Sequence, residues 1–202
     1  MKPKIKAIIW DLVGVLWREE DPTPRRILAA EFGLEVEALN DLVIYSESAA
    51  QATAGIKRED EHWRWVAGQI GIQPIDLPVF IHRYWEGDRF DMNLAGFIGV
   101  LKKDNKTSLL SNAWSGTRKL INEFLGQQDI FHEVMISAEV KVAKPDPAIY
   151  IKMLNSLNVA PREAIFIDDT FINILSAREL GINAIHYHNA GQAMADVRAF
   201  TG

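Results

Sequence analysis

Short apolar runs of strand length alternate with amphipathic segments through most of the second half of the chain. The apolar runs are residues 107–111, 132–136, 164–167 and 184–187, and a similar run stands near the start at 7–10. Helical periodicity is found at 93–103, 116–125, 147–157, 170–180 and 192–200. Strands that alternate with helices indicate a parallel sheet with right-handed crossovers. The pattern therefore predicts an α/β fold, a Rossmann-like parallel sheet with helices on both faces.

Residues 17–90 follow a different pattern, with helical periodicity and no convincing buried strand. Four helices are expected, at 22–33, 35–54, 57–70 and 77–86. Glycines close the first three of these segments, as they commonly do at helix ends. Consecutive short helices suggest a small bundle. We therefore expect residues 1–16 and 91–202 to form the α/β core domain, and residues 17–90 to form a helical cap domain inserted after the first strand.

The composition is that of a soluble globular protein, with 48% hydrophobic and 24% charged residues. The first apolar run stops at Asp11, too early for a signal peptide or a membrane span. The absence of cysteine excludes disulfides and thiolate metal sites and favours a cytoplasmic location. A formal net charge of −5 argues against nucleic acid or an anionic membrane as the main partner. A monomer or a homodimer is expected.

Polar residues follow the expected strands at four places. They are Asp11, the pair Ser111-Asn112, the segment Lys144-Pro-Asp-Pro and the pair Asp168-Asp169. Asp11 by itself is equally compatible with a helix N-cap. In a parallel sheet, however, the carboxyl ends of the strands meet at one edge, where ligands bind. The four groups are therefore expected to converge on one crevice.

The convergence of these groups predicts a specific kind of chemistry. Three carboxylates in one crevice repel each other unless cations offset their charge. Lys144 offers one positive charge, and a hard divalent cation with oxygen ligands would supply the rest. Ser111, Asn112 and the backbone amides before the next helix would form an anion site. Together these features describe phosphoryl transfer through an aspartyl-phosphate.

The same motifs resemble, in order, the four motifs of the haloacid dehalogenase superfamily. They are Asp11-Leu-Val-Gly-Val-Leu, Leu110-Ser-Asn, Lys144-Pro-Asp-Pro-Ala-Ile-Tyr and Phe166-Ile-Asp-Asp-Thr-Phe-Ile-Asn. The gap of one hundred residues between Asp11 and Ser111 resembles the branch with a helical cap between the first two motifs, including its sugar-phosphate phosphatase-like members. The resemblance covers the whole chain. It implies a Mg²⁺-dependent phosphatase of small phosphorylated metabolites.

The resemblance also implies a role for each motif residue. Asp11 resembles the nucleophile and a metal ligand, and the backbone carbonyl of Val13 resembles a second ligand. Asp169 resembles the direct acidic Mg²⁺ ligand, and Asp168 a ligand bound directly or through water. The remaining roles are phosphate contacts for Ser111 and Asn112, a bridge between nucleophile and phosphate for Lys144, and loop support for Asn173.

Val13 is the main departure from the family pattern. Most phosphatases of the superfamily carry at this position a second Asp that acts as general acid and base, and valine cannot transfer a proton. A milder departure is Val15, where the family commonly has Thr. Two alternatives to the phosphatase stay open: a metal-independent 2-haloacid dehalogenase, and a degenerate member that binds a phosphorylated ligand without turnover. The acidic pair Asp168-Asp169 favours the phosphatase, because dehalogenases usually lack it.

Other candidate residues are given structural or secondary roles. His186 and His188 share one strand face, but we interpret them as structural because no third ligand lies near them in sequence. Trp17 and Trp114 lie close to motifs and are candidates for walls of the pocket. Residues 17–90 contain 8 basic and 14 acidic residues, a net charge of −6, against 14 and 13 in the rest of the chain. An acidic cap favours a small substrate whose charge is met by the metal and Lys144.

Overall fold

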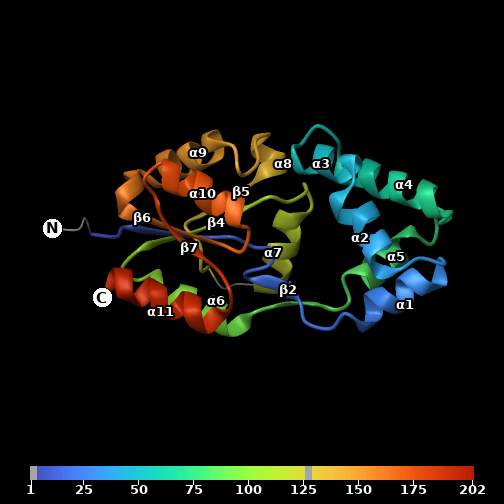
Figure 1. Ribbon diagram of the computed structural model, residues 1–202, viewed down its shortest axis with the longest axis horizontal. Helices are drawn as coiled ribbons and strands as arrows, with labels where there is room; N and C mark the ends of the chain where they lie inside the picture. Colours follow the sequence, from blue (N-terminus) through green and yellow to red (C-terminus); the bar gives the residue numbers. More distant parts are fainter. Residues whose placement is uncertain (1–3, 126–128) are drawn as a thin grey trace.

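The computed structural model describes residues 4–125 and 129–202, and a five-stranded parallel sheet forms the centre of one half of the molecule (Figure 1). The strand order is β5 (Glu133–Ile136), β4 (Lys106–Ser111), β1 (Ala7–Trp10), β6 (Ala164–Asp168) and β7 (Asn183–His186). Each pair of neighbours is parallel. The predicted strands are found to within one residue at their ends, and the predicted α/β fold is confirmed.

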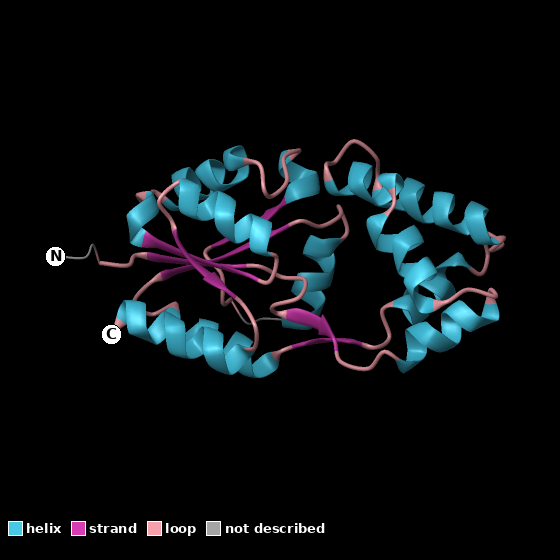
Figure 2. Cartoon of the chain, in the orientation of Figure 1, coloured by secondary structure: helices cyan, strands magenta, loops and turns pink. Residues whose placement is uncertain are grey.

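Helices cover both faces of this sheet (Figure 2). On one face α6 (Met92–Leu101), α7 (Thr117–Leu125) and α11 (Ala190–Thr201) pack on inward side chains such as Ile8 and Trp10. On the other face α9 (Pro147–Leu157) and α10 (Phe171–Glu179) pack on Ala7 and Ile9. Successive residues of a strand point to opposite faces, so every residue of β1 is buried. This double burial explains the uninterrupted apolar run in the sequence.

The segment between β1 and β4 contains a helical bundle with a core of its own. Its elements are α1 (Thr23–Glu31), α2 (Val36–Asn40), the π-helix η1 (Asp41–Tyr45), α3 (Glu47–Thr53), α4 (Glu59–Ile70) and α5 (Leu77–Tyr84). Trp63 and Phe80 are buried in this core with Leu28, Leu39 and Val66. Among the described residues, no helix has both the length and the apolar character needed to cross a bilayer.

Two expectations about this segment were wrong. A short antiparallel pair, β2 (Trp17–Glu19) and β3 (Asp88–Phe90), lies where no strand was expected. A strand of three residues is too short to show the alternation of apolar and polar positions by which strands are recognised in a sequence. The helix expected at 35–54 is interrupted: α2 passes into the π-helix, and α3 starts anew after Ser46, whose hydroxyl accepts a hydrogen bond from the Ala49 amide at 3.1 Å. The predicted cap, residues 17–90, begins at the first residue of β2 and ends at the last residue of β3. The division of the chain into two domains stays a prediction.

Smaller elements complete the fold. The short helix α8 (Ser137–Val140) follows β5, and a 3₁₀ turn, η2 (Pro161–Glu163), precedes β6. The sequence prediction contained neither, because segments of three or four residues are too short to show helical periodicity.

A loop after β4 joins the core to the helical bundle. Trp114 of this loop lies among the bundle residues, with its ring 4.7 Å from that of His62 and 5.5 Å from that of Trp63. Its indole nitrogen donates to the Thr53 hydroxyl at 3.2 Å. The Gly116 amide donates to the Glu59 carboxylate at 2.6 Å. Trp114 therefore anchors the bundle on the core, a more specific role than the pocket wall expected from the sequence.

A buried ion pair fixes the β2–β3 pair to the bundle. The Arg25 guanidinium of α1 lies 2.9 Å from Asp88 and 3.0 Å from Glu19, and it donates to the Tyr84 carbonyl at 3.2 Å. Burial raises the pKa of Asp88 to about 6 despite the neighbouring Arg25. A buried carboxylate that loses its partner is strongly destabilising.

Arg25→Met is therefore expected to lower the free energy of unfolding by about 3 kcal/mol. Arg26→Met is the matched control, because the next side chain along α1 is exposed, and its expected change is below about 0.5 kcal/mol. Urea denaturation followed by circular dichroism measures both. Equal losses in the two variants would contradict the assigned role of the buried pair.

Candidate active site

Lys144 lies at the centre of the polar groups that end the strands. Its ammonium is 2.8 Å from Asp11 Oδ1 and 2.7 Å from Asp168 Oδ2, and it donates to the Leu110 carbonyl at 3.0 Å. Asp11 directly follows β1, and Asp168 is the last residue of β6, the neighbouring strand. The parallel sheet thus brings together three residues that are separated by more than twenty positions in the sequence.

The charges of this group depend on each other because all three side chains are buried. Burial raises the pKa of Asp11 to about 7; Lys144 opposes that rise and Asp168 adds to it. Burial works to lower the pKa of Lys144, but the two carboxylates outweigh burial and raise it. The lysine therefore stays an ammonium ion, and its charge limits the rise in the pKa of Asp11, so that part of the Asp11 population is a carboxylate near neutral pH.

The two adjacent acidic residues have different surroundings. Asp168 is fully buried, and its oxygens also accept from the Thr170 amide at 2.7 Å and from the Asn173 side chain at 3.1 Å. Asp169 is exposed, and a long contact of 3.4 Å joins it to the Thr170 hydroxyl. Asp168 thus holds Lys144 in place, whereas Asp169 keeps carboxylate oxygens free for a ligand.

Carboxylate oxygens of Asp11, Asp168 and Asp169 all lie within 4.8 Å of one another. Hard divalent cations such as Mg²⁺ take oxygen ligands of this kind. The three carboxylates therefore fit the predicted Mg²⁺ ion. Other contacts leave the oxygens of Asp11 and Asp169 more accessible to a metal than those of Asp168.

Gly14 brings the loop that follows Asp11 against the acidic pair. Its φ of +86° lies in the left-handed region, and a Cβ built there would be 2.1 Å from Asp169 Oδ2. Only glycine allows this approach. The side chain of Val13 beside it is 52% exposed. The role of the Val13 carbonyl as a metal ligand stays a prediction.

Ser111 and Asn112 differ in what their side chains do. The Ser111 hydroxyl is buried and has no hydrogen-bond partner among residues 4–125 and 129–202, so it is free to contact an oxygen of a bound phosphate. The Asn112 amide group donates to the Lys144 carbonyl and accepts from the Lys144 amide, each at 2.8 Å. The side chain of Asn112 therefore positions Lys144, a role that the sequence prediction did not contain.

His186 was interpreted as structural, and it lies beside the acidic pair. Residue 186 is the register partner of Asp168 on β7, and its Nε2 is 2.9 Å from the Asp169 carbonyl. Its ring also lies 4.5 Å from that of His188. The alternation of the two histidines along the strand was visible in the sequence, but their contact with the Asp169 backbone depends on strand pairing.

Gly14→Ala is expected to displace the Asp169 carboxylate and to weaken binding of a divalent cation at least about tenfold, since it would remove a charged ligand from its place. Gly33→Ala is the matched control: its φ is +68°, but no atom lies within 4 Å of the added Cβ. Both variants should lose about 1 kcal/mol of stability from backbone strain. Calorimetric titration with Mg²⁺ measures the affinity. Equal affinities in both variants would contradict the contact between Gly14 and Asp169.

Curated relatives match most of the chain. A drimenol cyclase of Aspergillus calidoustus is 25% identical over 202 residues, 98% of this chain but 37% of the relative. This chain therefore spans little more than a third of that relative. A sesquiterpene phosphatase of Aspergillus oryzae is 22% identical over 198 residues, which are 98% of this chain and 97% of the relative.

Solved structures share the fold. A HAD family enzyme from Bacteroides thetaiotaomicron, in complex with magnesium and inorganic phosphate, superposes with a TM-score of 0.78 at 22% identity, over 91% of this chain and 94% of that chain. A 2-haloacid dehalogenase from Pseudomonas syringae gives a TM-score of 0.66 at 19% identity, over 97% and 99% of the two chains. The model of the haloacid dehalogenase-like hydrolases matches residues 5–181. The chain belongs to the haloacid dehalogenase-like hydrolase family.

Proposed function

We propose that this hydrolase is a Mg²⁺-dependent phosphatase that cleaves phosphate monoesters of small metabolites through an aspartyl-phosphate on Asp11. The observation that carries the proposal is the arrangement around Lys144: a buried ammonium holds Asp11 and Asp168, while Asp169 keeps its carboxylate exposed. This arrangement combines a nucleophile, a fixed positive charge and a free oxygen ligand at one sheet edge.

The proposed reaction has two steps. In the first, an Asp11 carboxylate oxygen bonds to phosphorus, the bond from phosphorus to the alcohol oxygen breaks, and the leaving oxygen takes a proton from water. Lys144 offsets negative charge on the phosphoryl group, and the unpartnered Ser111 hydroxyl donates to one of its oxygens. Mg²⁺, held by Asp11 and Asp169, would supply the positive charge that lets the anionic nucleophile and phosphate approach. In the second step, the oxygen of a water molecule bonds to phosphorus, the bond from phosphorus to the Asp11 oxygen breaks, and the water gives a proton to solvent, which leaves free phosphate and the Asp11 carboxylate.

The comparisons support this choice over the dehalogenase. One relative that matches nearly the whole chain is a sesquiterpene phosphatase, and one structural neighbour is a complex with magnesium and phosphate. Dehalogenases share the fold as well. The oxygen-ligand cluster of Asp11, Asp168 and Asp169 favours the metal-dependent reaction, since displacement of halide by a carboxylate needs no metal. A protein that binds a phosphorylated ligand without turnover would keep the same site, and only activity measurements separate it from the phosphatase.

Hydrolysis of 4-nitrophenyl phosphate tests the proposal. The enzyme treated with EDTA should be inactive, and added Mg²⁺ should restore its activity. Asp11→Asn should remove activity by several orders of magnitude while the protein stays folded, because an amide is not a nucleophile toward phosphorus. Asp104→Asn, at an exposed position on the opposite edge of the sheet, is the matched control and should keep full activity. Full activity in EDTA, or turnover by Asp11→Asn, would refute the mechanism.

The absence of a carboxylate at position 13 gives a second prediction. Positioned acid catalysis typically contributes about 10²–10⁴-fold when the leaving alcohol is a poor one. Rates should therefore fall steeply as the pKa of the leaving group rises. Val13→Asp should raise kcat/KM for alkyl phosphates about tenfold or more, while Val100→Asp, at another exposed valine on α6, should not. A flat dependence in the wild type, with chemistry limiting the rate, would mean that another group supplies the proton.

A further inference from the structure

A cluster of four aromatic side chains lies beside the nucleophile loop. It consists of Trp17, Trp85, Phe90 and Phe124, and we call it the aromatic cluster. Trp17 and Phe90 are cross-strand partners in β2 and β3, and their rings stack at 5.5 Å and 22°. Phe124 of α7 stacks on Phe90 at 5.0 Å, and Trp85, at the end of α5, lies 5.6 Å from Trp17. Segments of the core and of the helical bundle thus meet in one apolar surface.

Backbone contacts attach this cluster to the nucleophile loop. The Gly14 amide donates to the Trp17 carbonyl at 2.9 Å, and Val13 forms an isolated bridge with Trp17. Residues 13 and 17 therefore lie side by side, two and six positions after Asp11. The aromatic cluster therefore adjoins the loop that follows Asp11.

Much of this apolar surface is open to solvent. Val13 is 52% exposed and Phe124 is 50% exposed, and Trp17 and Trp85 are half-buried. A contiguous apolar surface that is open to solvent is typical of ligand-binding grooves. The nearest cation along the chain, Arg18, is engaged by Asp91 at 2.9 Å and by the Tyr187 hydroxyl at 2.8 Å. The surface next to Asp11 is thus largely apolar. The positive charge of Arg18 beside it is already paired with Asp91.

We propose that the aromatic cluster and Val13 bind the organic part of the substrate, and that this part is apolar. On the proposed function, on which this inference rests, the substrates are then phosphate monoesters of alkyl or aryl alcohols rather than of sugars. Contact with aromatic rings favours apolar groups in proportion to the area buried. Sugar hydroxyls placed against the same surface would lose hydrogen bonds to water without replacement.

A series of straight-chain alkyl phosphates, from ethyl to hexyl, tests this inference. The leaving-group pKa hardly changes along the series, so the lack of an acid at position 13 affects all members equally. Burial of each added methylene is expected to raise kcat/KM about fourfold until the cluster is covered. Propyl phosphate should also exceed glycerol 3-phosphate, which has the same carbon chain with two hydroxyls.

Phe124→Ser should flatten the dependence on chain length. Phe200→Ser is the matched control, because Phe200 is 41% exposed on α11 and lies outside the cluster. It should leave the dependence as in the wild type. The non-hydrolysable alkylphosphonates, measured by calorimetry in the presence of Mg²⁺, give a readout that needs no turnover: affinity should rise from ethyl- to hexylphosphonate in the wild type and less in Phe124→Ser.

The outcomes separate this inference from the proposed function. Hydrolysis of 4-nitrophenyl phosphate with no effect of chain length on kcat/KM or on phosphonate affinity would overturn the inference and leave the phosphatase intact. A chain-length dependence that Phe124→Ser and Phe200→Ser change equally would also overturn it. Loss of all hydrolysis and of phosphonate binding in the wild type would overturn both.

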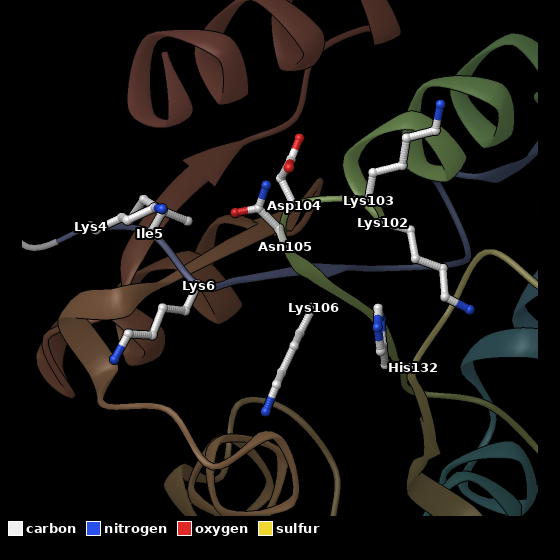
Figure 3. A pocket seen from close by; sticks show the side chains of 9 residues that line it. All are labelled: Lys4, Ile5, Lys6, Lys102, Lys103, Asp104, Asn105, Lys106 and His132. Atoms are coloured by element: carbon white, nitrogen blue, oxygen red, sulfur yellow. The ribbon is translucent and has the colours of Figure 1, made fainter.

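A lysine-lined hollow on the opposite edge of the sheet does not form a comparable site (Figure 3). It measures about 420 Å³ and includes Lys4, Lys6, Lys102, Lys103, Lys106 and His132. Lys6 pairs with Glu163 at 2.6 Å, and Lys102 pairs with Asp129 at 2.7 Å. The labelled lysine side chains point in different directions rather than toward one centre.

Discussion

The contact of one ammonium group with two buried carboxylates is the interaction on which the rest of the site depends. Burial alone drives the pKa of Asp11 upward, and the charge of Asp168 adds to the effect. Lys144, at 2.8 and 2.7 Å from the two carboxylates, opposes both. Without Lys144, the pKa of Asp11 would rise further, and the carboxyl group would stay protonated at neutral pH. The sheet and the polar side chains around Lys144 hold this lysine in place.

That support comes from the sheet and from polar side chains around it. Two strands buried on both faces end at Asp11 and Asp168, so the backbone fixes the separation of the two carboxylates. The Asn112 side chain holds both backbone polar groups of Lys144, and Asn173 holds Asp168. Asn112 directly follows β4, and Asn173 lies in the first turn of α10, so regular elements fix both supporting side chains. A site built in this way loses little entropy when a ligand binds.

The sequence predicted those parts of the structure that depend on local patterns. The strands are continuous apolar runs, and Asp11, Ser111 and Asp168 end or directly follow them, so these residues could be expected to lie at the same end of the sheet. The parts that it missed depend on contacts between distant segments. The contact of the Asn112 side chain with the Lys144 backbone, 32 positions away, was not predicted, and the expected phosphate contact of Asn112 stays a prediction. The aromatic cluster joins residues 17, 85, 90 and 124, and no window of sequence contains its pattern. The β2–β3 pair was missed for the same reason.

The central claim is that Asp11 accepts the phosphoryl group while Asp169 shares a metal ion with it. A crystal structure of the protein grown with Mg²⁺ and beryllium fluoride, a mimic of a phosphorylated carboxylate, tests this claim most directly. The account predicts beryllium bonded to an Asp11 oxygen, Mg²⁺ ligated by Asp11 and Asp169, and the Lys144 ammonium and Ser111 hydroxyl in contact with fluoride. Beryllium fluoride bound elsewhere, or Mg²⁺ without Asp11 among its ligands, would contradict it.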